Sequence, residues 1–296
     1  MDWAPVTSRT DVIEAFAPAK INLFLHVGDK RSDGFHDLES LAVFVDVGDT
    51  LAFSPSPELS LALDGPFANG LEAEGDNLVL RAAQALAKHI GRPATAAIRL
   101  TKKLPVASGI GGGSADAAAV LRGLTRLWAL DLSWTELRVV AETIGSDVPV
   151  CVECKSSWME GRGERVTPSA TLPQMPMLLV NPGIAVSTKD VFRALAMRHG
   201  TGSINRATSL SSPPELIAFL KKAANDLQPS AQQIAPVIGH VLDELARMPG
   251  VELWRMSGSG ATCFALFDDQ NSAKVAEVAL SHTHPDWWVR ATRIGS

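Results

Sequence analysis

Long apolar runs, signal-like segments and cysteines are scarce in this chain of 296 residues, and each absence excludes a class of protein. No apolar stretch approaches the ~20 residues that a bilayer-spanning helix needs. The opening Met-Asp-Trp-Ala-Pro lacks the basic segment and apolar stretch of a secretory signal peptide. The three cysteines are few and odd in number, which suits a reducing compartment. These absences predict a cytoplasmic protein without a membrane partner.

Positive charge is also scarce. The 27 lysines and arginines are outnumbered by 32 acidic residues, which gives a net charge of −5, and no basic run is visible. This balance argues against nucleic acid as a partner. A small anionic ligand remains compatible with it, because local N–H groups and one or two lysines suffice to bind one.

Two of the cysteines, Cys151 and Cys154, have the C-x-x-C spacing found in zinc sites. No second pair and no nearby histidine completes such a site. The surrounding run is strand-like, so it predicts buried thiols instead.

The length of the chain predicts one large or two modest domains. The proline-rich stretch 167–176 is the best candidate for a boundary, which divides the chain into 1–170 and 171–296. Strands and helices interleave without strict βαβ alternation, which predicts an α+β fold.

Apolar periodicity and turn residues predict the individual elements. Strands are expected at 12–17, 21–27, 38–47, 50–53, 59–63, 97–100, 177–180, 251–256, 261–267 and 287–293, a hairpin at 158–166, and a turn leading into a strand at 146–152. Helices are expected at 77–90 (capped by Asp76), 114–130, 133–144, 187–198, 213–223, 230–248 and 271–282. The polar stretch 203–212 predicts a mobile loop.

The most informative stretch, 105–116, reads Pro-Val-Ala-Ser-Gly-Ile-Gly-Gly-Gly-Ser-Ala-Asp. It lies between a predicted strand and a predicted helix, so its glycines can present free N–H groups and the positive helix end to a phosphate. A P-loop is excluded, because no lysine follows Gly113. A dinucleotide fingerprint is disfavoured, because Ser114 stands where glycine is required and Asp131 precedes a capping box at 133–136. A helix start kept glycine-rich for tight packing is the alternative.

Three further signals accompany this stretch. Lys20 and Asn22 share one face of an otherwise apolar strand, and a buried ammonium needs a partner. Asp147 follows a helix-ending glycine and could supply that partner, although a turn aspartate bonded to its own backbone is the commoner case. The run Ser257-Gly-Ser-Gly between two strands permits close approach to a ligand or to the first glycine loop, with a plain hairpin turn as the rival.

The order and spacing of these stretches, from about Phe16 to Phe267, resemble the three motifs of the GHMP kinases. The resemblance implies a two-domain α+β fold with an N-terminal nucleotide-binding domain like domain 2 of ribosomal protein S5. It also implies a C-terminal ferredoxin-like layer and an active site in the cleft between the two domains. It assigns ATP phosphate binding to Pro105, Gly109, Ile110, Gly111, Gly112, Gly113 and Ser114, and the third glycine motif to Gly258, Ser259 and Gly260.

Further details resemble one branch of this superfamily: Ala-Lys-Ile-Asn-Leu-Phe-Leu-His-Val from Ala19, Arg-Ser-Asp-Gly-Phe-His-Asp-Leu from Arg31, and Ser-Asp-Val-Pro-Val from Ser146. That branch implies ATP-dependent phosphorylation of the 2-hydroxyl of diphosphocytidyl-methylerythritol, in the non-mevalonate route to isoprenoid precursors. It assigns Asp147 as the general base and Lys20 as its charge partner. The substrate-binding residues it implies are Asn22, Phe35, His36, Asp147, Thr188 and Phe192.

Within that assignment, Phe35 stacks on cytosine and His36 bonds the base edge. Many members have tyrosine at the position of Phe35, and this chain has no tyrosine at all. Phe192 could instead be a core residue of a capped amphipathic helix. The small-molecule partners expected are ATP and a cytidine-diphosphate sugar alcohol, and the chain is expected to be a monomer or a weak homodimer.

Two departures from the family pattern concern the catalytic loops. Ser146 replaces the usual alanine, and Ser114 lies later than the serine that binds Mg²⁺ in some relatives. Mg²⁺ is therefore expected with ATP, but its ligands are not assigned.

Other functions remain open. A homoserine or mevalonate type of GHMP kinase would not need the aromatic residue Phe35. A silent nucleotide sensor would not need Lys20 and Asp147. An RNA-binding module is disfavoured by the negative charge.

Overall fold

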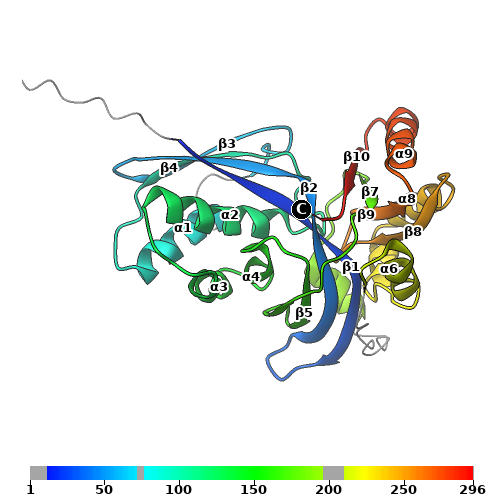
Figure 1. Ribbon diagram of the computed structural model, residues 1–296, viewed down its shortest axis with the longest axis horizontal. Helices are drawn as coiled ribbons and strands as arrows, with labels where there is room; N and C mark the ends of the chain where they lie inside the picture. The colour runs from blue at the N-terminus through cyan, green and yellow to red at the C-terminus, as the bar shows by residue number, and fades with distance from the viewer. Residues whose placement is uncertain (1–11, 72–76, 196–209, 296) are drawn as a thin grey trace, which may run out of the picture.

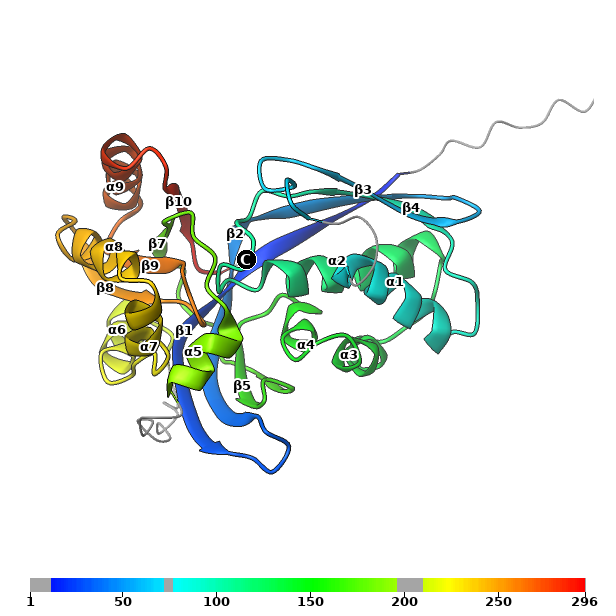
Figure 2. The same cartoon turned by 180° about the vertical axis from the view of Figure 1, so that it is seen from behind.

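The computed structural model describes residues 12–71, 77–195 and 210–295 as an α+β molecule with two sheets (Figures 1 and 2). The first sheet has the order β3-β4-β2-β5-β6, with β1 paired to β2. Its strands are β1 (Ile13–Lys30), β2 (His36–Ser54), β3 (Leu59–Asp64), β4 (Ala96–Thr101), β5 (Ser157–Gly161) and β6 (Arg165–Pro168). The second sheet contains β7 (Pro176–Asn181), β8 (Val251–Met256), β9 (Cys263–Phe267) and β10 (Trp288–Arg293).

Two groups of helices accompany the sheets, one in each half of the molecule (Figure 1). The first group is α1 (Leu78–His89), α2 (Gly112–Leu127), α3 (Trp134–Glu142) and α4 (Val148–Cys151). The second group is α5 (Thr188–Leu195), α6 (Pro213–Leu220), α7 (Gln228–Ile234), α8 (Val237–Ala246) and α9 (Gln270–Thr283). No described helix has the length and apolar character needed to cross a membrane.

The second sheet has the order β10-β7-β9-β8 and is antiparallel throughout. Numbered within this half, the order is 4-1-3-2, and the helices lie between the first and second strands and between the third and fourth. This is the ferredoxin-like arrangement that the resemblance to the GHMP kinases implies.

The long hairpin of β1 and β2 connects the two halves. Its central residues are buried on both faces, which explains their nearly continuous apolar character. On one face Ala42 and Phe44 join the core under α2. On the other face Ile21 and Val43 join a core that includes β7 and β9. The two halves therefore share an apolar core, even though the sheets divide the chain between β6 and β7.

A buried arginine adds a polar link between the halves. Arg255 of β8 donates hydrogen bonds to the carbonyl oxygen of Leu23 at 2.6 Å and to those of Leu220 and Ala223 at 2.9 and 2.7 Å. Burial lowers the pKa of the Arg255 guanidinium to about 10. Three carbonyl acceptors satisfy three of its five donors where water is excluded.

The sequence predicts separate strands at 12–17 and 21–27, but in the structure β1 continues through residues 17–20 as one strand. Pro18 lies where the pairing with β2 shifts register, between Pro18 and Lys20, and proline is tolerated at such irregularities. The strands predicted at 38–47 and 50–53 are likewise one strand, β2. The helix predicted at 230–248 is two helices, since Pro236 precedes α8 and lacks the N–H needed to continue α7.

The prediction of a strand after Ser146 is wrong, because residues 148–151 form the short helix α4, which has a proline in its first turn. Cys151 on this helix is fully buried, as expected, and burial raises the pKa of its thiol. Cys154 is half-buried, and burial raises its pKa as well.

Of the two helix caps that the sequence predicts, one is present and the other is a different residue. The predicted capping box is present, with Ser133 and Glu136 exchanging their hydrogen bonds at the start of α3. Asp76 lies outside the described residues. The predicted cap of α1 is wrong by one residue, because the side chain that caps this helix is that of Asn77, which accepts from the N–H of Val79 at 2.9 Å. Two other predictions lie partly outside the described residues: the loop at 203–212, over residues 203–209, and the helix at 187–198, over residues 196–198.

Candidate active site

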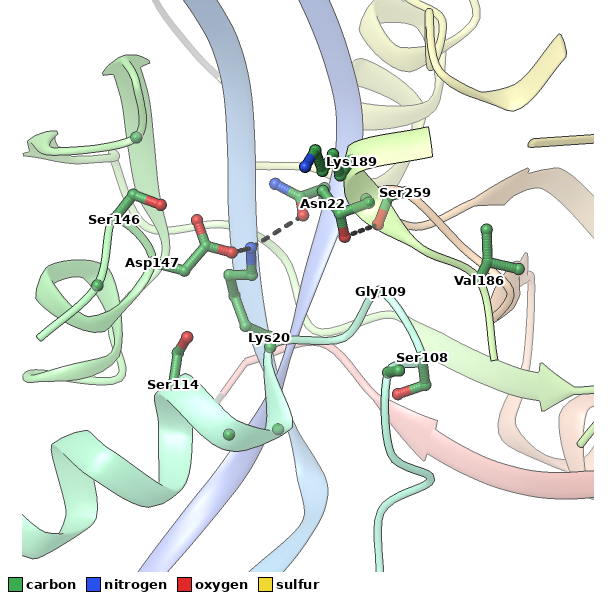
Figure 3. Close-up of a pocket in the computed structure, with 18 of the residues that line it drawn as sticks. Lys20, Asn22, Ser108, Gly109, Ser114, Ser146, Asp147, Val186, Lys189 and Ser259 are labelled. Atoms are coloured by element: carbon green, nitrogen blue, oxygen red, sulfur yellow. Dashed lines mark hydrogen bonds and ion pairs between the residues drawn. The ribbon is translucent and has the colours of Figure 1, made fainter. Parts of the chain in front are cut away.

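A cleft of about 1360 Å³ opens between the two halves. It is lined by segments from both: β1, the β1–β2 turn, the first glycine loop, the start of α2, the segment before α4, α5 and the third glycine motif. Figure 3 shows the centre of this cleft, where Lys20, Ser114 and Asp147 approach one another from three different elements.

Lys20 and Asp147 form an ion pair at the centre of the cleft. The Lys20 Nζ atom lies 2.8 Å from the Oδ2 atom of Asp147, although the residues are 127 positions apart. The lysine side chain is 4% exposed and the aspartate side chain 37% exposed. The cation is therefore buried beneath a carboxylate that faces the open cleft, where it can reach a bound hydroxyl.

Asn22 holds the lysine from the other side. Lys20 Nζ donates to its Oδ1 atom at 3.0 Å, and its Nδ2 atom donates to the Ser40 hydroxyl at 2.7 Å. Ser40 in turn donates to the carbonyl oxygen of Phe24 at 2.6 Å. This buried chain fixes Asn22 and gives it a role in positioning Lys20, beside the substrate contact that the sequence suggests.

The first glycine loop ends at the N-terminus of α2. Gly111 occupies the capping position with φ of 65°, and no side chain caps the helix. The first N–H groups of a helix have no acceptor within it, so those following Gly111 are free to bind an anion. Ser114 also lines the cleft here. Ile110, by contrast, is fully buried in the core between the halves. Its carbonyl oxygen accepts a hydrogen bond from the backbone N–H of Lys20 at 2.9 Å.

The two glycine motifs contact each other directly. A Cβ atom on Gly109, whose φ is +75°, would lie 2.5 Å from the carbonyl oxygen of Ser257, and one on Gly258 would lie 2.7 Å from that of Gly109. The Ser257 hydroxyl accepts from Asn22 N at 3.1 Å and donates to the Gly109 carbonyl at 3.0 Å. Part of the glycine signal therefore reflects loop-to-loop packing. Gly258 and Ser259 line the cleft, whereas Gly260 is absent from its lining.

A cluster of buried charged side chains supports the loop, and two of its members, Lys102 and Asp116, also line the cleft. Lys102 Nζ lies 2.7 Å from Asp116 Oδ2 on α2 and also contacts Asp49 of β2. Asp49 Oδ1 accepts from the N–H groups of Lys103 and Leu104 at 2.5 and 2.8 Å. These contacts anchor both ends of the glycine loop, yet one cation faces two carboxylates.

Burial raises the pKa of Asp116 to about 7; Lys102 opposes this shift and Asp49 adds to it. We expect the ionisation of Asp116 to destabilise the fold. The stability conferred by its raised pKa is fully present below about pH 4, the unfolded value, and is lost as the pH rises through 7. The pKa of Lys102 is raised by the two carboxylates, so the lysine stays protonated in this window.

Asp116→Asn should accordingly flatten the fall in unfolding free energy between about pH 4 and pH 7, by at most on the order of 1 kcal/mol per pH unit. Urea unfolding at several pH values measures this slope. The exposed Asp131→Asn variant is the control and should keep the wild-type slope. Equal slopes for Asp116→Asn and wild type would contradict the assignment.

Aromatic side chains gather at the other end of the cleft. His36 stacks on Phe192 of α5, with ring centroids 5.8 Å apart and planes at 29°. Phe35 is 53% exposed, and the Arg162 guanidinium lies 5.1 Å from its ring centroid. Phe192 also packs against the core of the C-terminal half, so its ring combines both roles weighed for it.

The third glycine motif is tied to α5 beside these rings. Thr188 Oγ1 lies 2.8 Å from the Ser259 hydroxyl. This hydrogen bond joins two residues that the sequence places in different parts of the site.

Sequence reasoning missed several groups that the fold brings to the cleft. Arg162 and Lys189 line it, although neither was predicted to be a site residue. The position of Arg162 between two glycines of the β5–β6 turn is the only local signal for it. Ser257 belongs to the run for which the sequence predicts an approach to the first glycine loop, and the structure shows that approach. The particular bonds of its hydroxyl had no local signal, since they join residues 148 and 235 positions away.

Comparison with known proteins agrees with this geometry. Residues 77–155 match the family described as GHMP kinases N terminal domain, and residues 210–286 match GHMP kinases C terminal. The 4-diphosphocytidyl-2-C-methyl-D-erythritol kinase of Rhodospirillum rubrum is 50% identical over 284 residues, covering 96% of this chain and 92% of its own. The enzyme of the same name from Ruegeria pomeroyi is 51% identical and covers 95% and 99%.

Solved structures show the same relation. A crystal structure of 4-(cytidine 5'-diphospho)-2C-methyl-D-erythritol kinase aligns with a TM-score of 0.74 at 32% identity, covering 96% of this chain and 100% of that one. Homoserine kinase from Cytophaga hutchinsonii aligns with a TM-score of 0.71 over 99% of this chain and 97% of its own, but at 18% identity it shows the shared fold alone. The chain belongs to the 4-diphosphocytidyl-2-C-methyl-D-erythritol kinase family, a branch of the GHMP kinases.

Proposed function

We propose that the chain transfers the γ-phosphoryl group of ATP to the 2-hydroxyl of 4-diphosphocytidyl-2-C-methyl-D-erythritol. The observation that carries this proposal is the contact between Lys20 and Asp147. It lies between a free helix end suited to phosphate and an aromatic cluster suited to a nucleobase. A kinase of this kind must hold phosphates, stabilise spreading negative charge and aim a base at the acceptor hydroxyl.

In the proposed reaction, the N–H groups at the start of α2 and the Ser114 hydroxyl hold the ATP phosphates. Asp147 accepts the proton of the 2-hydroxyl as that oxygen attacks the γ-phosphorus. The bond between the γ-phosphorus and the bridging oxygen breaks, and ADP leaves. Lys20 orients Asp147 through their 2.8 Å contact, and its charge stabilises the transferring group.

Mg²⁺ is part of this proposal, and the residues present fit it. Mg²⁺ takes oxygen ligands and is commonly held by one or two protein groups together with substrate phosphates. The Ser114 hydroxyl and the Asp147 carboxylate are such oxygen donors on the cleft wall. The ion would neutralise charge on the transferring phosphoryl group.

The cytidine end of the substrate is assigned to Phe35, His36 and Phe192. His36 Nδ1 lies 3.2 Å from the carbonyl oxygen of Gly28, which orients the ring and leaves Nε2 for the base edge. Arg162 and Lys189 supply positive charge nearby, where the diphosphate of the substrate would lie. All of these groups belong to one chain, so a monomer or a weak homodimer would suffice for catalysis. We also still expect a cytoplasmic location.

Phe35→Ala should raise KM for the cytidyl substrate by about tenfold or more, since a stacked base contributes about 1–3 kcal/mol. The KM for ATP should stay within about twofold, because ATP contacts the other end of the cleft. Steady-state kinetics with each substrate varied in turn would measure both values. Phe16→Ala is the matched control, because Phe16 is also an exposed phenylalanine but lies outside the cleft. A change confined to ATP would refute the aromatic subsite.

The overall proposal is tested by coupled ADP release with ATP and Mg²⁺. The acceptors compared are the diphosphocytidyl substrate, homoserine and mevalonate. Turnover on the first alone is expected. Turnover on another alcohol would retain Asp147 as the base but discard the cytosine subsite. Nucleotide binding without turnover on any acceptor would favour a sensor, although the intact pair of Lys20 and Asp147 argues against that outcome.

A further inference from the structure

A second group of chemically reactive side chains lies outside the cleft, on the C-terminal half. His240 and Glu244 belong to α8, and His284 follows α9 directly. One ligand atom from each of these three residues lies within 4.8 Å of the others. Within the described ranges, this is the one group of three or more histidine, cysteine or acidic side chains close enough together to hold a metal ion.

The local structure presents these atoms to one point. His240 and Glu244 are four residues apart, so they share one face of α8. The His284 ring stacks on Trp287 at a centroid distance of 3.8 Å and an interplanar angle of 9°. The His240 ring meets His284 edge-on at 5.3 Å and Trp287 edge-on at 5.5 Å. The indole therefore forms a rigid wall against which both imidazoles are placed.

The carboxylate is also oriented. Arg247 Nη1 donates to Glu244 Oε1 at 2.8 Å, which leaves the Oε2 atom available. Hydrogen-bonded partners of this kind fix metal-binding side chains and raise metal affinity. In a tetrahedral site with bonds of about 2.1 Å, two ligand atoms lie ~3.4 Å apart. The His240 side chain is exposed and can rotate, so the distances between the three ligand atoms can shorten to that value.

We propose that His240, Glu244 and His284 bind a divalent transition-metal ion of the zinc class. Two imidazoles and one carboxylate form a ligand set that zinc accepts, with water completing the tetrahedron. None of the three residues lines the cleft. The ion would therefore connect α8 to the turn between α9 and β10, and it would stabilise the C-terminal half without entering the phosphoryl transfer.

Isothermal titration of the full chain with Zn²⁺ alone, at neutral pH and without nucleotide, tests this site. Wild type should bind one Zn²⁺ that His240→Ala and Glu244→Gln each weaken by at least about tenfold, because loss of even an outer partner commonly costs that much. His89→Ala is the matched control, since His89 is an exposed helical histidine in the other half. It should bind like wild type.

Thermal unfolding provides an independent readout. Zn²⁺ should raise Tm of wild type and of His89→Ala more than Tm of His240→Ala at the same concentration, because a ligand of the folded state stabilises it by mass action. His240 is exposed, so its replacement should leave the zinc-free fold and the kinase turnover as in wild type. Absence of zinc binding to wild type would overturn the proposal. The same binding in wild type and His240→Ala would overturn it too, by placing the ion elsewhere.

Discussion

Asp147→Asn should lower kcat by about 10²–10⁴-fold, the usual contribution of a positioned general base. Asparagine keeps the shape of the side chain and can still accept from Lys20 Nζ, which lies 2.8 Å from the present carboxylate. It cannot take the proton of the acceptor hydroxyl. The Kd for ATP should stay within about twofold, because the helix end that binds phosphate is unchanged.

Asparagine is preferred to alanine at this position for a structural reason. Alanine would leave the buried Lys20 ammonium without its carboxylate. Breaking a fully buried pair commonly costs about 3–5 kcal/mol of stability, and the cost here should be smaller, because Asp147 is 37% exposed and Lys20 also bonds to Asn22. Single-turnover kinetics and equilibrium ATP binding are the measurements, with the exposed Asp131→Asn as the control. Loss of ATP binding together with turnover would show that Asp147 has a structural role instead.

Gly109→Ala should both unfold the protein more easily and nearly abolish its activity. The residue has φ of +75°, and an added Cβ would lie 2.5 Å from the Ser257 carbonyl oxygen and 2.7 Å from Gly260 N. Strain of about 1–2 kcal/mol from the left-handed backbone adds to about 1–3 kcal/mol from overpacking. The two glycine loops must move apart, and a displacement of about 1 Å in a catalytic loop can cost about 10²-fold in rate.

Gly91→Ala separates the two causes. Gly91 also has a positive φ, of +68°, but a Cβ there would meet nothing within 4 Å. This variant should therefore lose only the strain of about 1–2 kcal/mol and keep full kcat/KM. Urea unfolding and steady-state kinetics on both variants would measure these effects. Equal losses for the two would mean that packing between the glycine loops contributes nothing.

Much of the local structure was predictable from the sequence. The capping box at the start of α3 and the strand β8 occur where the residue pattern places them. Two of the predictions that failed concern proline in an unusual position. Pro18 lies inside a long strand at a register shift, and Pro149 lies in the first turn of a helix rather than before a strand. Sequence patterns alone do not separate these cases, because proline fixes φ but is compatible with both a strand irregularity and the first helical turn.

The sequence by itself determined the residue types of the site: a lysine in an apolar strand, an aspartate after a glycine, and glycines before a helix. Only the tertiary structure decided which of them meet. It joins Lys20 to Asp147 across 127 positions, and it brings Ser257 against Gly109 across 148. Local hydrogen bonding and periodicity act over a few residues, whereas these contacts depend on strand register and on the core shared by the two halves.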